Sequence, residues 1–99
     1  MCGRFASYKN LNKLKNIFNI YNSDFNTTKS YNISPGQDVN IVLNYKFENY
    51  LLSSNWGYNF INNKTKNKQS VINSRIETIN SKLLFKDSFL KRKCIIPAN

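Results

Sequence analysis

The sequence predicts an α+β fold, in which a twisted and mainly antiparallel β-sheet is flanked by helices. Three observations lead to this class. Apolar residues recur at helical spacing near the start of the chain, and a later segment alternates apolar and polar residues as a strand does. A second apolar run follows that segment after a short polar turn, which is typical of an antiparallel hairpin. The 99 residues suit one small domain.

The first expected element is an amphipathic helix that begins after Asn10. An asparagine suits this position because its side-chain oxygen accepts a backbone N–H of the first helical turn. The apolar positions that follow have helical spacing: Leu11, Leu14, Ile17, Phe18 and Tyr21. We interpret this stripe as a face that packs on the core rather than as a ligand site.

The hairpin is expected over residues 39–45 and 50–56, with a polar turn at 46–49. One buried face is predicted for the first strand from its alternating residues, with Val42 as the exception: Val39, Ile41, Leu43 and Tyr45. Trp56 falls on the same alternation as Tyr50, so we assign it to packing.

Beyond the hairpin, a polar loop is expected at residues 62–70, and a short apolar strand at Val71-Ile72 places Asn73-Ser74-Arg75 at its end. One or two short helices are expected between residues 78 and 93, and a strand at residues 94–96.

Two side chains in this later region carry an expectation of their own. Glu77 is expected to open a helix, where an acidic side chain suits the helix dipole. Cys94 is expected to be buried and unreactive in its apolar strand.

The charge balance favours a polyanionic partner. Fifteen basic and five acidic residues give a net charge of +10, which supports nucleic-acid binding through counterion release. The same charge also serves solubility, and lysine is over-used along the whole chain together with asparagine, so individual lysines carry little information.

Composition argues against several other classes of protein. Two cysteines and no histidine are too few ligands for a zinc site, so neither a metal nor another cofactor is expected. No apolar run approaches the roughly 20 residues of a membrane-spanning helix, and no signal peptide is evident. We expect no membrane partner and a reducing, intracellular compartment.

Cys2 is the residue with the most distinctive chemistry. Removal of Met1 leaves a free α-amino group beside the thiol of Cys2. Such an aminothiol captures an aldehyde first as a Schiff base and then as a five-membered thiazolidine. The amine titrates near ~8 and the thiol near ~8.5, so both are partly available at neutral pH. The alternative is an inert cysteine near a frayed terminus.

Five separated segments of the chain form a recognisable series: Met1-Cys2-Gly3-Arg4-Phe5-Ala6, Tyr31-Asn32-Ile33-Ser34-Pro35-Gly36, Trp56-Gly57-Tyr58, Ile72-Asn73-Ser74-Arg75-Ile76-Glu77-Thr78 and Cys94-Ile95-Ile96-Pro97-Ala98. In order and spacing they resemble motifs of the SRAP family, the SOS response-associated peptidases. The resemblance runs through the whole chain. It implies that residues 1–99 are the N-terminal part of a single SRAP domain.

The function that the resemblance implies is abasic-site processing in the DNA damage response. Such a protein binds single-stranded DNA, forms a covalent thiazolidine crosslink to an abasic site through Cys2, and has self-processing peptidase and lyase-like activity. Two alternatives stay open. One is a non-catalytic, basic nucleic-acid-binding module with an incidental Cys2, and the other is an N-terminal-nucleophile hydrolase.

The resemblance also assigns roles to single residues. Cys2 is the nucleophile, and Asn73 hydrogen-bonds at the reacting sugar or orients the Cys2 amine, unless it only caps the end of a strand. Arg4 and Arg75 are expected to bind phosphates that flank the lesion, since a guanidinium matches phosphate geometry. The alternative for each arginine is a surface ion pair, for example of Arg75 with Glu77.

Asn32 and Pro35 are expected to lie beside the DNA, because they match the segment that does so in the family. Pro35 then stacks on a base or only fixes a turn. The partner is therefore expected to be single-stranded DNA with abasic sites, bound by a monomer. The expected compartment is the bacterial cytoplasm at the nucleoid, or the nucleus of a eukaryote.

Two departures from the family pattern limit these expectations. The family usually has a proline and an aromatic residue after its Trp-Gly pair, whereas this chain has Asn59-Phe60-Ile61-Asn62. Phe60 is expected to take the place of the family's aromatic residue. The family pattern also continues beyond Cys-x-x-Pro-Ala to a catalytic glutamate and a histidine, which this chain lacks. We therefore expect a chain truncated on its C-terminal side.

Overall fold

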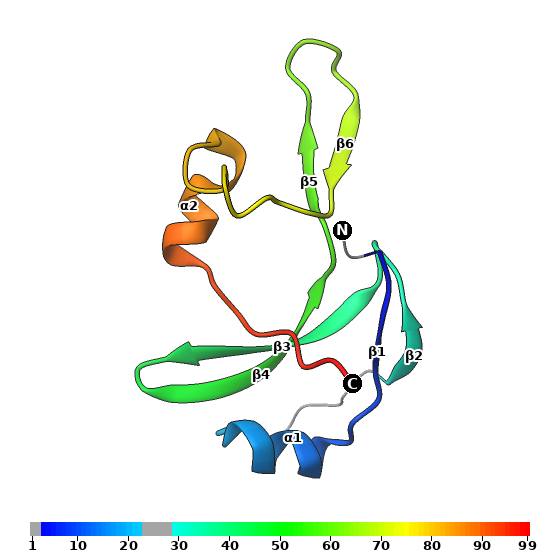
Figure 1. Cartoon of the computed structure of the whole chain (residues 1–99), viewed down its shortest axis with the longest axis vertical. Helices are drawn as coiled ribbons and strands as arrows, with labels where there is room; N and C mark the ends of the chain where they lie inside the picture. Colours follow the sequence, from blue (N-terminus) through cyan, green and yellow to red (C-terminus); the bar gives the residue numbers. More distant parts are fainter. Residues whose placement is uncertain (1–2, 23–28) are drawn as a thin grey trace.

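The computed structural model describes residues 3–22 and 29–99 and confirms the α+β class. Figure 1 shows the elements in chain order: β1 (Phe5–Ser7), α1 (Leu11–Phe18), β2 (Ser30–Ile33), β3 (Asp38–Tyr45), β4 (Glu48–Asn55), β5 (Tyr58–Ile61), β6 (Lys68–Val71) and α2 (Leu83–Lys91). The antiparallel pairing is as expected, but the described strands are divided among three two-stranded sheets, β1-β2, β3-β4 and β5-β6.

Helix α1 confirms the first prediction. The Asn10 side chain accepts a hydrogen bond of 2.9 Å from the backbone N–H of Lys13, which satisfies a free donor of the first turn. The helix ends at Phe18 because Asn19 adopts the left-handed conformation, with φ 52° and ψ 58°. Tyr21 therefore lies beyond the helix and is 65% exposed, so its assignment to the apolar stripe was wrong.

The β3-β4 hairpin is confirmed, and Val39 of the face predicted to be buried is 3% exposed as expected, but Val42, the predicted exception, also lies in the core. Val42 is only 4% exposed and forms the core with Leu14 of α1 and Leu51 of β4, which is its register partner. Helix α1 covers this face of the hairpin, whereas Tyr45, on the alternate positions, is largely exposed. Alternation alone does not reveal which face a helix covers.

The turn of this hairpin explains its tight register. Lys46 and Phe47 both have positive φ, at 50° and 68°, as a two-residue turn of type I′ requires. Asn44 and Asn49 pair next to this turn, and their side chains are hydrogen-bonded at 3.0 Å. The predicted turn at 46–49 is therefore shorter in the structure, because β4 already begins at Glu48.

Strand β6 begins earlier than expected. Residues 68–71 pair with β5, so part of the segment taken as a polar loop is a strand. Figure 1 shows that the β5-β6 hairpin extends away from the other elements. Asn73 and Arg75 follow directly after β6, as predicted.

The C-terminal region departs from three expectations. Glu77 lies in a run of turns at residues 76–81 and does not open a helix, since α2 begins only at Leu83. The strand expected at 94–96 is reduced to one bridge, in which Ile95 and Val42 exchange two backbone hydrogen bonds of 2.8 Å. Because this single bridge leaves the neighbouring side chains uncovered, Cys94 is exposed rather than buried.

The last residues close onto β1. Ser7 is buried and donates its hydroxyl to the carbonyl of Pro97 at 2.8 Å, and the backbone N–H of Asn99 donates to the carbonyl of Ala6 at 2.8 Å. The C-terminus accordingly lies beside β1 in Figure 1. Strand β1 is thus held from one side by β2 and from the other by this segment.

Candidate functional site

The candidate site starts at the β1-β2 sheet, where two predicted DNA-binding residues meet. Arg4 donates from Nη1 to Oδ1 of Asn32 at 3.2 Å, and both side chains are exposed. The register that pairs Phe5 with Ile33 brings them to the same end of the sheet. This contact orients an exposed guanidinium, a group whose planar fork suits an anionic oxygen pair.

Trp56 joins three of the motif segments. Its ring lies 5.5 Å from that of Phe5, centroid to centroid, and its indole N–H donates to the carbonyl of Ile72 at 3.3 Å. The assignment of Trp56 to packing is confirmed, although β4 ends at Asn55 and the packing partner is Phe5. Trp56 thus links the start of β1 to the segment that carries Asn73.

The Pro35-Gly36 turn is attached to the same tryptophan. The backbone N–H of Gly36 donates to the carbonyl of Trp56 at 2.9 Å, and the N–H of Trp56 donates to the carbonyl of Gln37 at 3.0 Å. Gly36 has φ 90°, which favours glycine at this position. Pro35 is half-buried here, so the turn is fixed in place beside Trp56.

Gly57 allows the close approach of β5 to the end of β6. Its φ is 133°, and a Cβ at this position would lie 3.1 Å from Oγ of Ser70. A side chain here would be strained in its backbone and would press on β6. The structure therefore explains both residues of the Trp-Gly pair: Trp56 packs against Phe5, and Gly57 leaves room for β6.

Asn73 and Arg75 line a cavity of about 370 Å³ between the end of β6 and α2. Asn73 is half-buried and Arg75 is exposed. The lining residues are Val71, Asn73, Ser74, Arg75, Lys82, Leu84 and Phe85. Arg75 and Lys82 give this cavity two cationic side chains, which suits an anionic ligand.

The alternative reading of Arg75 as half of an ion pair finds no support in the described part of the chain, where the ion pairs are those of Asp87 with Lys91 and Arg92. The Arg75 carbonyl instead accepts from the backbone N–H groups of Thr78 and Ile79, which shapes the turn after the motif.

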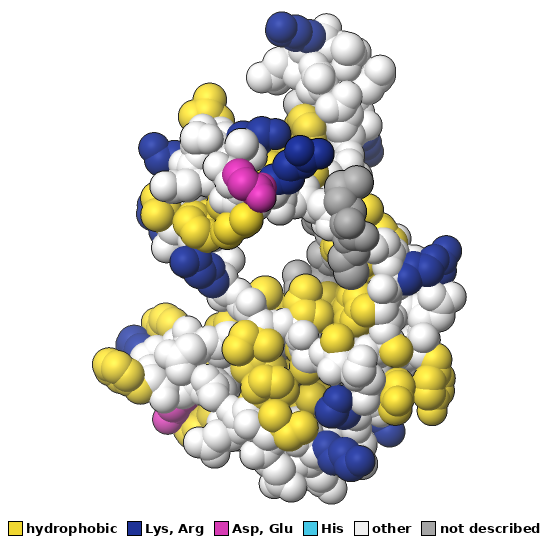
Figure 2. All heavy atoms as spheres, in the orientation of Figure 1, with side chains coloured by type: hydrophobic (Ala, Val, Ile, Leu, Met, Phe, Trp, Pro, Cys, Tyr) yellow, Lys and Arg dark blue, Asp and Glu magenta, His cyan; other side chains and the backbone are white. Residues whose placement is uncertain are grey.

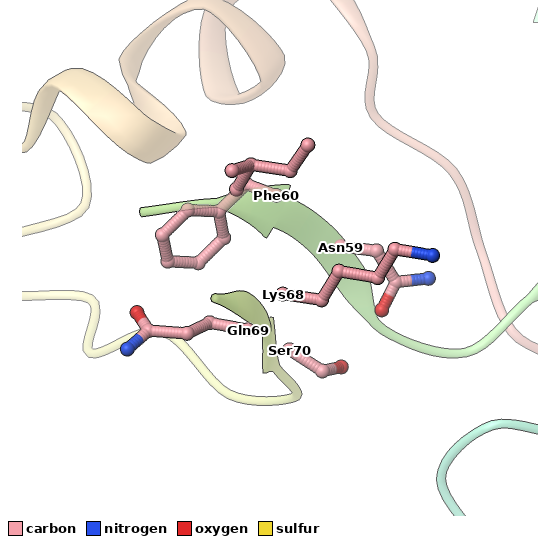
Figure 3. A pocket seen from close by; sticks show the side chains of 6 residues that line it. Asn59, Phe60, Lys68, Gln69 and Ser70 are labelled. Carbon is pink, nitrogen blue, oxygen red and sulfur yellow. The ribbon is translucent and has the colours of Figure 1, made fainter. Parts of the chain in front are cut away.

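A second cavity, of about 420 Å³, lies on the β5-β6 hairpin. Its lining includes Phe60 of β5 and Gln69 of β6, which are register partners, and Figure 3 shows both on one side of the hairpin while Asn59 and Lys68 point to the other. The Phe60 ring lies 6.2 Å from the ring of Tyr58. An exposed aromatic ring is a group on which nucleic-acid bases stack, and Phe60 is the residue that the sequence offered in place of the family's aromatic residue.

Cys2 lies outside the described residues, as does Met1. Of the remaining predicted site residues, the structure brings Arg4 to Asn32, attaches the turn of Pro35 to Trp56, and places Asn73 and Arg75 on one cavity. Lys82 and Phe85 of that cavity were not anticipated. One lysine in a lysine-rich chain cannot be identified as a site residue from the sequence. The pattern around Phe85 predicts only a helix residue that packs on the core.

The positive charge is distributed widely. In Figure 2, Lys and Arg side chains are scattered over the face shown rather than gathered into one patch. Although Cys94 is exposed, the atoms packed around its sulfur partly desolvate it, and this desolvation raises the pKa of the thiol because it disfavours the thiolate. None of the described helices is long and apolar enough to cross a membrane. Within residues 3–22 and 29–99, no three Cys, His, Asp or Glu side chains gather as metal ligands.

Comparison with known proteins gives relatives that match the whole of this chain. The abasic site processing protein YoqW of Bacillus subtilis (strain 168) is 31% identical over 104 residues, which cover all of this chain and 46% of the relative. YoaM and YobE of the same strain, also named abasic site processing proteins, are 32% and 30% identical, with 45% and 47% of their lengths covered. The chain thus spans slightly less than half the length of these relatives.

No solved structure matches the chain. The family model described as SOS response associated peptidase (SRAP) matches residues 1–99, the full length of the sequence. The order of the five motif segments, and the contacts that join four of them around Trp56, agree with this match. The chain belongs to the SOS response associated peptidase (SRAP) family.

Proposed function

We propose that this chain acts in abasic-site processing, by binding single-stranded DNA and linking Cys2 covalently to the abasic sugar. The observation that carries the proposal is the convergence of separate motif segments on Trp56, with Arg4 and Asn32 at one side and the Asn73 cavity following Ile72. The names of the relatives, abasic site processing proteins, support the same role.

The chemistry begins with removal of Met1, by self-processing or by an aminopeptidase, which frees the α-amino group of Cys2. The ring-opened abasic sugar presents an aldehyde. The amine adds to the aldehyde carbon and water leaves, which gives a Schiff base. The Cys2 sulfur then attacks the imine carbon, its proton passes to the nitrogen, and a thiazolidine ring closes. This ring shields the lesion from strand cleavage.

The remaining site residues bind and orient the DNA, whereas Cys2 forms the covalent bond. Arg4 and Arg75 bind phosphates on either side of the lesion. Asn73 hydrogen-bonds at the reacting sugar or orients the Cys2 amine, for which its amide offers both a donor and an acceptor. Asn32 orients Arg4, and Pro35 holds the turn beside Trp56 against the DNA strand.

A crosslinking assay tests the proposal. The chain with Met1 removed is incubated with single-stranded DNA that contains one abasic site, and products are separated on a denaturing gel. We expect a heat-stable band of lower mobility with the wild-type chain and its complete loss with Cys2→Ala. Intact-mass measurement verifies that Met1 is absent, because a retained Met1 blocks the amine.

Cys94→Ala is the matched control, since it removes the other thiol and leaves Cys2 in place. It should crosslink as well as the wild type. A band of equal strength with Cys2→Ala, or no band with wild type, would show that the crosslinking mechanism is wrong for this chain. Salt-sensitive binding without a covalent band would instead support the alternative of a non-catalytic basic nucleic-acid-binding module.

A further inference from the structure

Strand β2 contains a bulge that exposes two neighbouring side chains. The register pairs of the β1-β2 sheet are Phe5 with Ile33 and Ser7 with Ser30. Two residues of β2, Tyr31 and Asn32, therefore lie opposite the single residue Ala6 of β1. Successive side chains of a regular strand point to opposite faces of the sheet, whereas a bulge re-aims a side chain. In agreement with this, both Tyr31 and Asn32 are exposed.

The ring of Tyr31 stacks on that of Tyr8, the residue that follows β1. The two ring centroids are 4.5 Å apart, and the ring planes meet at 27°. The other ring pairs within residues 3–22 and 29–99 are farther apart, at 5.5 to 6.2 Å, and meet at 35° to 62°. Tyr31 is nevertheless 79% exposed, so Tyr8 covers one face of its ring and the opposite face is open to solvent.

Tyr8 is a firm support for this ring because its backbone is fixed. Its N–H donates to Oδ1 of Asn99 at 2.7 Å, and the preceding Ser7 is buried and donates to the carbonyl of Pro97. A ring that is already held in place loses little side-chain freedom when a ligand binds. The open face of Tyr31 is therefore a flat surface that accepts another ring without rearrangement.

The open ring lies next to a cationic side chain. Asn32, adjacent to Tyr31 in the bulge, accepts the hydrogen bond of 3.2 Å from Arg4, and Lys9 follows Tyr8 along the chain. Proteins bind single-stranded nucleic acid with this combination, since a ring stacks on a base and the positive charge attracts the backbone. The net charge of +10 favours such a polyanion as the ligand of the ring.

We propose that the Tyr8-Tyr31 pair is a stacking platform for one undamaged base of the single-stranded DNA, next to the phosphate that Arg4 binds. The inference rests on the proposed function, in which Arg4 contacts a phosphate beside the lesion. It adds a subsite in which Tyr31 touches the base and Tyr8 positions Tyr31. Every base has a face that stacks, so this platform holds the strand without selecting its sequence.

The affinity for DNA gives the first test. The probe is a single-stranded oligonucleotide with one tetrahydrofuran site, which has no aldehyde and therefore cannot be linked to Cys2. We expect Tyr31→Ala to weaken binding by about tenfold, the loss of one stacked base, and Tyr31→Phe to bind as the wild type does. The slope of log K against log salt should stay unchanged in both variants, because no phosphate contact is removed.

Tyr45→Ala is the matched control. Tyr45 is 59% exposed and lies beside the turn of the β3-β4 hairpin, which Figure 1 places on the other side of the molecule from β2. Its replacement removes an exposed tyrosine ring from another strand and should leave the affinity unchanged. Circular dichroism verifies that each variant keeps the secondary structure of the wild type.

Photo-crosslinking identifies the contact itself. One 5-iodouracil is placed at successive positions on either side of the tetrahydrofuran site, since an irradiated iodouracil joins to an aromatic ring stacked on it with loss of hydrogen iodide. We expect a product at one of these positions, with Tyr31 in the modified peptide by mass spectrometry. Tyr8→Ala should lower its yield, because Tyr31 then loses its support.

Two results would overturn this inference and leave the proposed function standing. One is DNA binding that Tyr31→Ala weakens no more than Tyr45→Ala does, as expected if the tyrosine pair only covers the sheet. The other is a crosslinked peptide that does not contain Tyr31. Absence of any binding of the probe by the wild-type chain would overturn both the inference and the proposed function.

Discussion

The three arginines of this chain, among fifteen basic residues, have different roles in the structure. Arg92 is bound to Asp87 at 2.9 Å and to the Ser88 hydroxyl, so it stabilises the end of α2. Arg4 is oriented by Asn32, and Arg75 lines the cavity with Asn73. The two arginines that fall in the family motifs are thus the two that lie at the candidate site, beside Asn32 and on the Asn73 cavity.

Replacement of Arg75 by alanine should weaken binding to single-stranded DNA by about tenfold, the effect of losing a charge-assisted hydrogen bond. The slope of log K against log salt should also become shallower by about 0.7, since one phosphate contact is lost. Fluorescence anisotropy with a labelled oligonucleotide at several salt concentrations measures both quantities.

Lys64→Ala is the control for this prediction. It removes one positive charge from the loop between β5 and β6, away from the Asn73 cavity. An equal loss of affinity in Lys64→Ala and Arg75→Ala would mean that only total charge matters, and the assigned phosphate contact of Arg75 would be wrong.

Helix α1 shows how much local sequence determines at the level of an element. Asn10 is both the predicted and the observed N-cap, and Leu14 is the residue that the helix buries. Because the helix has only eight residues, it depends on its cap and on packing against Val42 and Leu51.

Asn10→Ala should lower the free energy of unfolding by about 1 kcal/mol, the usual cost of losing a side-chain N-cap. Asn12→Ala removes the same amide from an exposed position inside the helix and should be neutral or slightly stabilising, since alanine has the higher helix propensity. Urea unfolding followed by circular dichroism compares the two. Equal stability of both variants would contradict the capping role.

The predictions that failed are those that depend on what covers an element. The alternation in β3 was read correctly as a strand, but Val42 proved to be a core residue because α1 lies on its side of the hairpin. Cys94 was expected to be buried in a strand, and only one bridge forms there. Likewise, nothing local to Phe5 or Ile72 indicates that Trp56 joins them.

At the scale of the whole molecule, the excess of positive charge opposes compactness. A net charge of +10 on a chain of this size gives self-repulsion, which the five acidic residues do little to offset. Added salt screens such repulsion over about 10 Å at 0.1 M. The effect belongs to the charge distribution as a whole and not to any one ion pair.

The midpoint of thermal unfolding should therefore rise when sodium chloride is increased from about 0.02 M to about 0.2 M, because screening relieves the repulsion. Differential scanning fluorimetry measures the shift. A solution of glycine betaine, which has no net charge, at the same osmolality serves as the control for non-ionic effects. A midpoint that falls with salt would mean that attractive surface pairs outweigh the repulsion.

The contact between Ser7 and Pro97 has a consequence for synthesis of the protein. The two residues are 90 positions apart, and their hydrogen bond helps to fix β1, next to Arg4. Since a ribosome adds roughly 5 to 20 residues per second, β1 waits for seconds before that partner is made. During that interval β1 lacks one of the contacts that fix it, so the order of translation determines when β1 reaches its final position.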